Sequence, residues 1–186
     1  MLTGWVPRGV RRGPDVKEGR YAVKVSTRHA LSVPTSAALE LLADSDFLDW
    51  RCAQNIGMAE RLVTHRVNGD ELTIETTASV PVTWLPSRVV GHLPEPPRID
   101  RHEVWSLTGG RGRTWFEISL VPTTVSGVMR LQATGEQSCD LVYDIEMKVS
   151  LPLVGGLVER SVSSNMTKSL TAEATTYARF RASGSR

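Results

Sequence analysis

The fold prediction starts from Asp140–Val149, DLVYDIEMKV, which is followed by a short linker with Pro and Gly and then by a long helical pattern. Apolar residues occupy every second position of this stretch, and charged residues fill most of the positions between them. That alternation is typical of a strand with one buried face. The side predicted to be buried consists of Leu141, Tyr143, Ile145, Met147 and Val149, and the opposite side carries Asp144, Glu146 and Lys148.

The helical pattern after the linker runs to about Phe180 and is the longest in the chain. Its apolar residues fall in one broad sector of a helix, namely Val154, Val162, Met166, Leu170, Ala174, Tyr177 and Phe180. Glu159 and Glu173 fall in the same sector, so the apolar stripe is imperfect. The segment is rich in Ser and Thr, which are mediocre helix formers. We therefore expect this helix to depend on packing against the sheet.

The rest of the chain supplies one early strand, two short helices and five further strands. Alternation predicts the first strand from Tyr21 onward, and Thr35 or Ser36 is expected to cap the first helix, which ends at Leu42. A second short helix follows Asp44 and ends at Asn55 and Gly57. The further strands are predicted at 59–67, 72–80, 99–107, 114–121 and 126–134, with turns at 68–70 and 109–112 and an irregular crossing at 81–98.

This order, β-α-α-β6-α, joins neighbouring strands by short connections, which favours an antiparallel meander. With a single long helix to cover one face, the sequence predicts an α+β domain: a curved antiparallel sheet closed by a long C-terminal helix. We predict a disordered basic leader at 1–18, a single domain at 19–181 and a flexible C-terminus at 182–186.

Charge and composition exclude several functional classes. The chain has a formal net charge of +2, but residues 1–20 alone carry +3, so the domain itself lacks the basic stripe of a nucleic-acid reader. The two cysteines have no metal-ligand spacing, so neither a disulfide framework nor a zinc site is expected. The longest apolar run, 151–158, is too short for a transmembrane span, and no apolar core of a signal peptide follows the early arginines. We expect a cytoplasmic protein without a metal or cofactor, and the sequence leaves its oligomeric state open.

The predicted order, together with YDIEMKV at 143–149 and PLVGGLVE at 152–159, resembles the START-like (SRPBCC, helix-grip) superfamily. This superfamily includes plant allergen proteins and polyketide cyclases, and the resemblance is strongest to an actinobacterial branch of unknown function. It covers roughly residues 20–180. The resemblance implies that the sheet curls around the long helix and leaves a cavity between them. It carries over no catalytic motif.

Several inward-facing or loop residues are candidates for ligand binding, and each also has a purely structural interpretation. His65 shares a face with Val63 and Val67, so it is predicted to point inward, either to bind a ligand or as a hydrogen-bonded interior histidine. Tyr143 could orient a ligand or simply pack in the core. The other candidates are Trp84 in the proline-rich crossing, Trp105, and the pair Met147 and Met166, which could face each other across a cavity.

The strand at 99–107 has no clean face, so its orientation stays open. Arg101, Glu103 and Trp105 share one side. If that side points inward, Arg101 and Glu103 must form a buried ion pair. If it points outward, the pair is solvated.

Three functions are consistent with the sequence. The first is binding of a small apolar or amphipathic ligand, such as a lipid or a polyketide-like metabolite, in the implied cavity. The second is an interaction or structural domain that uses the basic leader. The third is an enzyme of the cyclase or hydratase type, in which His65 or Tyr143 would act with Arg101 and Glu103 as acid and base. Common nucleophile, metal and nucleotide motifs are missing from the sequence.

Overall fold

The computed structural model describes residues 21–55, 58–85, 87–91, 93–120, 123–149 and 155–182. Of these, only the backbone is described for 21–23, 88–89, 149, 155–163 and 182. The predicted leader at 1–18 and residues 183–186 lie outside the described residues, whereas helix α4 reaches Ala182.

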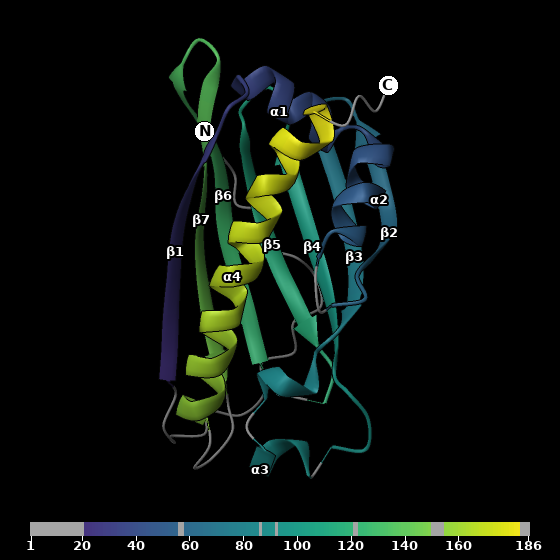
Figure 1. Cartoon of the computed structure of the whole chain (residues 1–186), viewed down its shortest axis with the longest axis vertical. Helices are drawn as coiled ribbons and strands as arrows, with labels where there is room; N and C mark the ends of the chain where they lie inside the picture. Colours follow the sequence, from purple (N-terminus) through teal and green to yellow (C-terminus); the bar gives the residue numbers. More distant parts are fainter. Residues whose placement is uncertain are drawn as a thin grey trace, which may run out of the picture.

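The described chain forms seven strands and several helices in the predicted order (Figure 1). The strands are β1 (Tyr21–Leu31), β2 (Arg61–Asn68), β3 (Glu71–Ser79), β4 (Arg98–Ser106), β5 (Arg111–Ile118), β6 (Thr123–Gly135) and β7 (Ser138–Val149). The helices are α1 (Thr35–Leu42), α2 (Ser45–Ala53), the 3₁₀ turn η1 (Val82–Trp84), α3 (Ser87–Val90) and α4 (Gly155–Ala182).

All seven strands form one antiparallel sheet in the order β1-β7-β6-β5-β4-β3-β2. Strands β2 to β7 follow one another as a meander, and only β1 is out of sequence order, because it pairs with β7 along its whole length. The predicted α+β helix-grip architecture is therefore confirmed, with β1 and β2 as the two edges.

Helix α4 crosses one face of the sheet, and α1 and α2 lie on that face beside its C-terminal end (Figure 1). The core lies between these helices and the sheet. Phe47 of α2 packs edge-on against Phe180 of α4, with ring centroids 5.2 Å apart, and Trp50 lies 5.4 Å from the same ring. Aromatic contacts of this kind add to the burial of apolar surface, so they anchor the end of α4.

Strand β7 has the faces that its alternation predicts. Leu141, Tyr143, Ile145 and Met147 are buried toward the helices, whereas Asp144 and Lys148 lie on the outer face, within reach of water. On the helix side, α4 buries Leu170, Ala174, Tyr177 and Phe180. Strand β7 and helix α4, from which the fold was predicted, thus face each other in the core, one in each of its two layers.

Three local predictions were wrong. The turn before β5 is at Leu107–Gly110 rather than 109–112, because Gly110 has the positive φ (58°) and Gly112 already belongs to the strand. Helix α1 is preceded by Pro34 without a side-chain cap, so neither Thr35 nor Ser36 caps it. The crossing at 81–98 contains η1 and α3, which were not predicted.

Gly127 in β6 leaves no room for a side chain against the paired strand β7. A Cβ atom there would overlap the backbone oxygen of Asp144 and lie 2.9 Å from the Cα of Ile145. Because backbone atoms of a paired strand cannot move aside, we expect Gly127→Ala to lower the free energy of unfolding by about 1–3 kcal/mol in urea denaturation.

The matched control for this prediction is Gly91→Ala, since a Cβ atom there would lie 3.8 Å from the Ser87 oxygen, an ordinary contact. It should change the unfolding free energy by no more than about 0.5 kcal/mol. Equal effects of the two substitutions would contradict the packing derived for β6 and β7.

Candidate functional site

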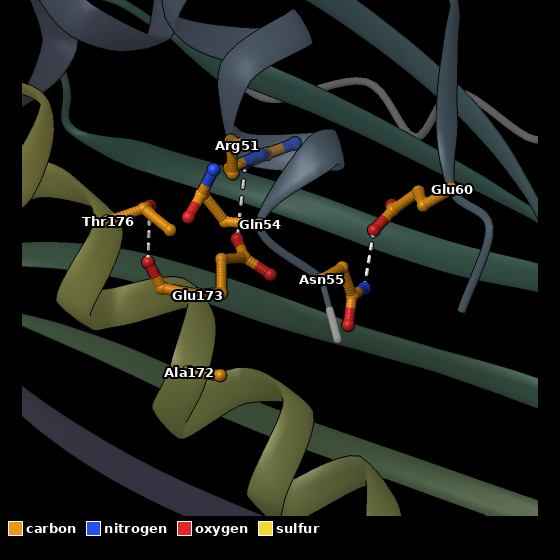
Figure 2. Close-up of a pocket in the computed structure, with 7 residues that line it drawn as sticks. All are labelled: Arg51, Gln54, Asn55, Glu60, Ala172, Glu173 and Thr176. Carbon is orange, nitrogen blue, oxygen red and sulfur yellow. Dashed lines mark hydrogen bonds and ion pairs between the residues drawn. The ribbon is translucent and has the colours of Figure 1, made fainter. Parts of the chain in front are cut away.

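Four charged side chains meet beneath α4, and we call them the charge cluster: Arg51, Arg101, Glu103 and Glu173. They come from three separate elements, with Arg51 on α2, Arg101 and Glu103 on β4, and Glu173 on α4. Arg101 binds Glu173 at 2.7 Å and Glu103 at 2.9 Å. Arg51 binds Glu173 at 3.1 Å and Glu103 at 3.3 Å, and Figure 2 shows Arg51 and Glu173 directed toward each other.

Two aromatic side chains complete the cluster by donating hydrogen bonds to its carboxylates. Trp105 donates from Nε1 to Oε2 of Glu103 at 2.8 Å, and Tyr143 donates from its hydroxyl to Oε1 of Glu173 at 2.9 Å. Each carboxylate oxygen of Glu103 and Glu173 therefore has a partner, and the two positive charges balance the two negative ones. Such saturation is what allows ions to be buried at a tolerable cost.

The cluster moves the pKa of Glu173 and that of Tyr143 away from neutral pH. Burial is the largest single influence on Glu173 and raises its pKa, but Arg101 and Arg51 and hydrogen bonds from Arg101 and Tyr143 outweigh it and lower the pKa to about 2. Burial, and then the charge of Glu173, raise the pKa of Tyr143 well above its usual value. At neutral pH Glu173 is therefore a carboxylate and Tyr143 a neutral phenol, and neither is poised near pH 7 as efficient acid–base catalysis requires.

A cavity of about 50 Å³ lies next to the cluster, between the sheet and α4. Its walls come from β3, β4, β5, η1, α4 and the connection from α2 to β2. The described lining residues are mostly apolar: Asn55, Met58, Glu60, Thr76, Ala78, Trp84, Ile99, Arg101, Phe116, Ile118, Met166, Ser169 and Leu170.

A smaller pocket of about 10 Å³ adjoins this cavity on the side of α2 (Figure 2). Both share Asn55 and Glu60, and both touch the charge cluster, the smaller one through Arg51 and Glu173 and the larger one through Arg101. Asn55 donates a hydrogen bond to Glu60 and accepts one from Ser169 of α4 at 3.4 Å. The polar side chains at this end thus tie the connection from α2 to β2 to helix α4.

Five of the six residues that the sequence singled out fall into three groups. Trp84 and Met166 line the cavity. Trp105 and Tyr143 are fully buried and bind the charge cluster. Met147 is fully buried in the core and is not among the residues that line the cavity, so the structure does not bring it together with Met166 around that space. Ligand binding by these residues stays a prediction.

His65, the sixth of these residues, lies on the edge strand β2, where a β-bulge between Leu62 and Thr64 shifts the alternation. His65 is paired with Ile74, a core residue, so its side chain is on the inner face as predicted. Val63, however, is the extra residue of the bulge and is 59% exposed, so the expected common face of His65 and Val63 was wrong. Val67 does share the face of His65, because it is paired with the buried residue Leu72. His65 has no contact with the charge cluster among the described interactions and lines neither of the two pockets.

The orientation of β4, which the sequence left open, is the inward one: Arg101, Glu103 and Trp105 are all buried. Sequence reasoning missed Arg51 and Glu173 as functional candidates. A signal for Glu173 was visible, because a carboxylate in the apolar sector of a helix requires a buried partner. Arg51 gave no such signal, since its partner Glu103 is 52 residues away in the chain.

Among the described residues, no group of three or more His, Cys, Asp or Glu side chains could hold a metal ion. Cys52 and Cys139 are both free and buried. No helix in the described part of the chain is long and apolar enough to cross a membrane.

Replacing Glu173 by Gln removes a charge that two buried arginines face. We expect Glu173→Gln to lower the free energy of unfolding by about 3–5 kcal/mol at pH 7. The pKa of Glu173 in the folded protein is below its ordinary value of 4.5, so its contribution is complete above that value and is lost as the pH falls toward 2. We therefore expect the difference in unfolding free energy between wild type and Glu173→Gln to become smaller as the pH falls from 4.5 toward 2. Urea denaturation at several pH values measures this difference.

The matched control is Glu146→Gln on the outer face, where Glu146 pairs with Lys148 at 3.1 Å in contact with water. An exposed pair of this kind contributes about 0–1 kcal/mol. A pH-independent difference for Glu173→Gln, or a cost no larger than that of the control, would refute the buried ion network.

Comparison with solved structures identifies the fold. The chain is similar to the Zhui aromatase/cyclase from Streptomyces sp. R1128, with a TM-score of 0.61 and 10% identity over 84% of this chain and 92% of that one. It is similar to a START superfamily protein from Mycobacterium smegmatis, with a TM-score of 0.54 and 11% identity over 82% and 97%. It is also similar to norcoclaurine synthase from Thalictrum flavum in complex with dopamine and hydroxybenzaldehyde, with a TM-score of 0.57 and 11% identity over 95% and 99%.

These likenesses confirm the START-like fold predicted from the sequence, and at such low identity they show the fold alone. No curated protein matches the sequence. The family described as "Protein of unknown function (DUF2505)" matches residues 26–180, which is most of the chain, and the protein therefore belongs to this family.

Proposed function

We propose that this protein binds a small, mainly apolar molecule in the cavity between α4 and strands β3, β4 and β5. The observation that carries the proposal is the composition of the walls. Aliphatic and aromatic side chains from both layers surround the space, including Ile99 and Phe116 from the sheet and Met166 and Leu170 from the helix. A few polar groups at one end of apolar walls are the usual form of a small-molecule site.

The volume of the cavity limits what can enter. About 50 Å³ holds a few water molecules, whereas pockets for drug-sized ligands measure roughly 300–1,000 Å³. A ligand must therefore be small, or it must displace wall residues on entry. Met166 and Trp84 are suited to such displacement, because both are only partly buried and methionine has an adaptable, unbranched side chain.

The charge cluster supports binding over acid–base catalysis. Arg101, Glu103 and Tyr143 do converge, through Glu173, as an enzyme would require. However, despite its burial Glu173 has a pKa of about 2 because Arg101 and Arg51 face it, burial raises the pKa of Tyr143 well above its usual value, and His65 is outside the cluster. A partner that binds through the basic leader stays a prediction, since residues 1–18 lie outside the described part of the chain.

The similarity in fold to norcoclaurine synthase adds limited support to the proposed ligand binding. Norcoclaurine synthase, which shares this fold, has been crystallised with dopamine and hydroxybenzaldehyde, which are small aromatic molecules. A fold can host many functions, so the proposal depends on the cavity rather than on the relative.

A cavity-filling substitution tests the proposal. Ethylbenzene, a small apolar probe, should bind wild type saturably in an NMR titration, with the chemical-shift changes centred on the residues that line the cavity. We expect Met166→Trp to fill the space and raise the Kd at least about tenfold, because the larger ring competes for the same volume.

The control adds the same ring on the outer face, at Val128, which is 43% exposed and is not among the residues that line the cavity. Val128→Trp should leave the Kd of ethylbenzene unchanged. Absence of saturable binding to wild type, or equal binding to Met166→Trp in a folded state, would overturn the proposal.

A further inference from the structure

We propose that the ligand of this cavity carries a neutral oxygen acceptor, such as a carbonyl, hydroxyl or ether oxygen, and that this oxygen accepts a hydrogen bond from Nε of Arg101. The inference rests on the proposed function and extends it from an apolar pocket to a chemical class of ligand. It depends on how Arg101 uses its donors and on the charges around the cavity.

One nitrogen of the Arg101 guanidinium, Nε, has no hydrogen-bond partner among the described residues. Its Nη1 and Nη2 groups bind Glu173 and Glu103. Its Nε is buried and has no hydrogen-bond partner among the described protein atoms. A buried donor without a partner costs roughly 1–3 kcal/mol, so this N–H strongly favours an acceptor that arrives from outside.

Arg101 is 8% exposed and lines the cavity. Its Nε has almost no exposed surface, so a ligand oxygen reaches this donor by displacing neighbouring side chains of the wall. The guanidinium carbon of Arg101 lies 5.7 Å from the ring centroid of Phe116, another lining residue. An aromatic or aliphatic body against Phe116 would therefore bring an attached oxygen toward Arg101.

The other polar groups of the lining are engaged with one another. Glu60 accepts hydrogen bonds from Asn55 and, at 2.8 Å, from Thr76. Ser169 donates to Asn55 at 3.4 Å. These contacts leave Arg101 Nε as the cavity-lining donor whose hydrogen bond is unmade among the described residues.

The charges around the cavity favour a neutral oxygen over a carboxylate. Arg51 and Arg101 are already balanced by Glu103 and Glu173. Glu60, also in the lining, adds a further negative charge. A carboxylate ligand would add another, without an unpaired cation in the cluster to offset it, and burying such a charge is costly.

A water molecule is the other acceptor that fits, since the volume is sufficient for one. Displacing an ordered water by a group that cannot replace its hydrogen bond loses affinity, whereas a ligand oxygen reproduces the bond. If the ligand oxygen accepts this hydrogen bond, an oxygenated ligand binds more tightly than the hydrocarbon of similar size. If a water molecule keeps the bond, the two ligands bind equally tightly.

Three probes of similar size test the inference on wild type: ethylbenzene, acetophenone and benzoate. Titrations followed by NMR should give a Kd for acetophenone about tenfold below that of ethylbenzene, and weaker binding of benzoate than of acetophenone. Equal affinities for ethylbenzene and acetophenone, or tighter binding of benzoate, would overturn the inference and leave the proposed function intact. Failure of all three probes to bind would overturn both.

Arg101→Lys provides the second test, because lysine keeps the positive charge but places a methylene group where arginine has Nε. We expect this variant to lose about tenfold in affinity for acetophenone and to keep its affinity for ethylbenzene. Arg130→Lys, on the outer face where Arg130 pairs with Asp144, is the matched control and should change neither Kd. An unchanged acetophenone Kd in Arg101→Lys would overturn the inference, and should that variant not fold, the wild-type comparison decides alone.

Discussion

The buried ion pairs among Arg51, Arg101, Glu103 and Glu173 are the interaction on which the rest of this structure depends. They connect α2, the centre of the sheet and α4, three elements that are far apart in the sequence. Because an unpaired buried charge is far more costly than the pair is favourable, each of these side chains requires the others. The ion pairs therefore specify the position of α4 on the sheet, while apolar contacts such as Phe47 with Phe180 supply the burial that stabilises it.

The same cluster shapes the candidate site. It occupies the space between helix and sheet on one side of the cavity, so that the cavity has apolar walls and a polar end. Arg101 belongs to both the cluster and the wall: its Nη1 and Nη2 groups bind Glu173 and Glu103, and its Nε has no hydrogen-bond partner among the described residues. In the site that we propose, a structural network would therefore also bind the ligand. Despite its burial, Glu173 has a pKa of about 2 because Arg101 and Arg51 face it, so it stays a carboxylate at neutral pH.

The architecture could be predicted from the sequence alone because the patterns that indicate its strands and its long helix are periodic. β7 alternates and α4 carries an apolar sector, and both patterns follow from having one buried face. Prediction was wrong where three-dimensional contacts override local signals. Gly112 resembled a turn residue but lies in β5, where a Cβ atom would come within 3 Å of Trp105 and Met129. The bulge in β2 and the pairing of Arg51 with Glu103 likewise depend on residues distant in the chain, and a cavity volume has no local signature at all.

We infer that the ion cluster and the cavity form one unit, in which Arg101 links the fold to the ligand. A crystal structure of the protein with acetophenone would decide this question. We expect the ring between Phe116 and Met166, the carbonyl oxygen about 3 Å from Arg101 Nε, and the four ion pairs of the cluster unchanged. Acetophenone bound elsewhere on the protein, or a cavity in which Arg101 Nε is bonded to another side chain and the ion pairs are broken, would refute the inference.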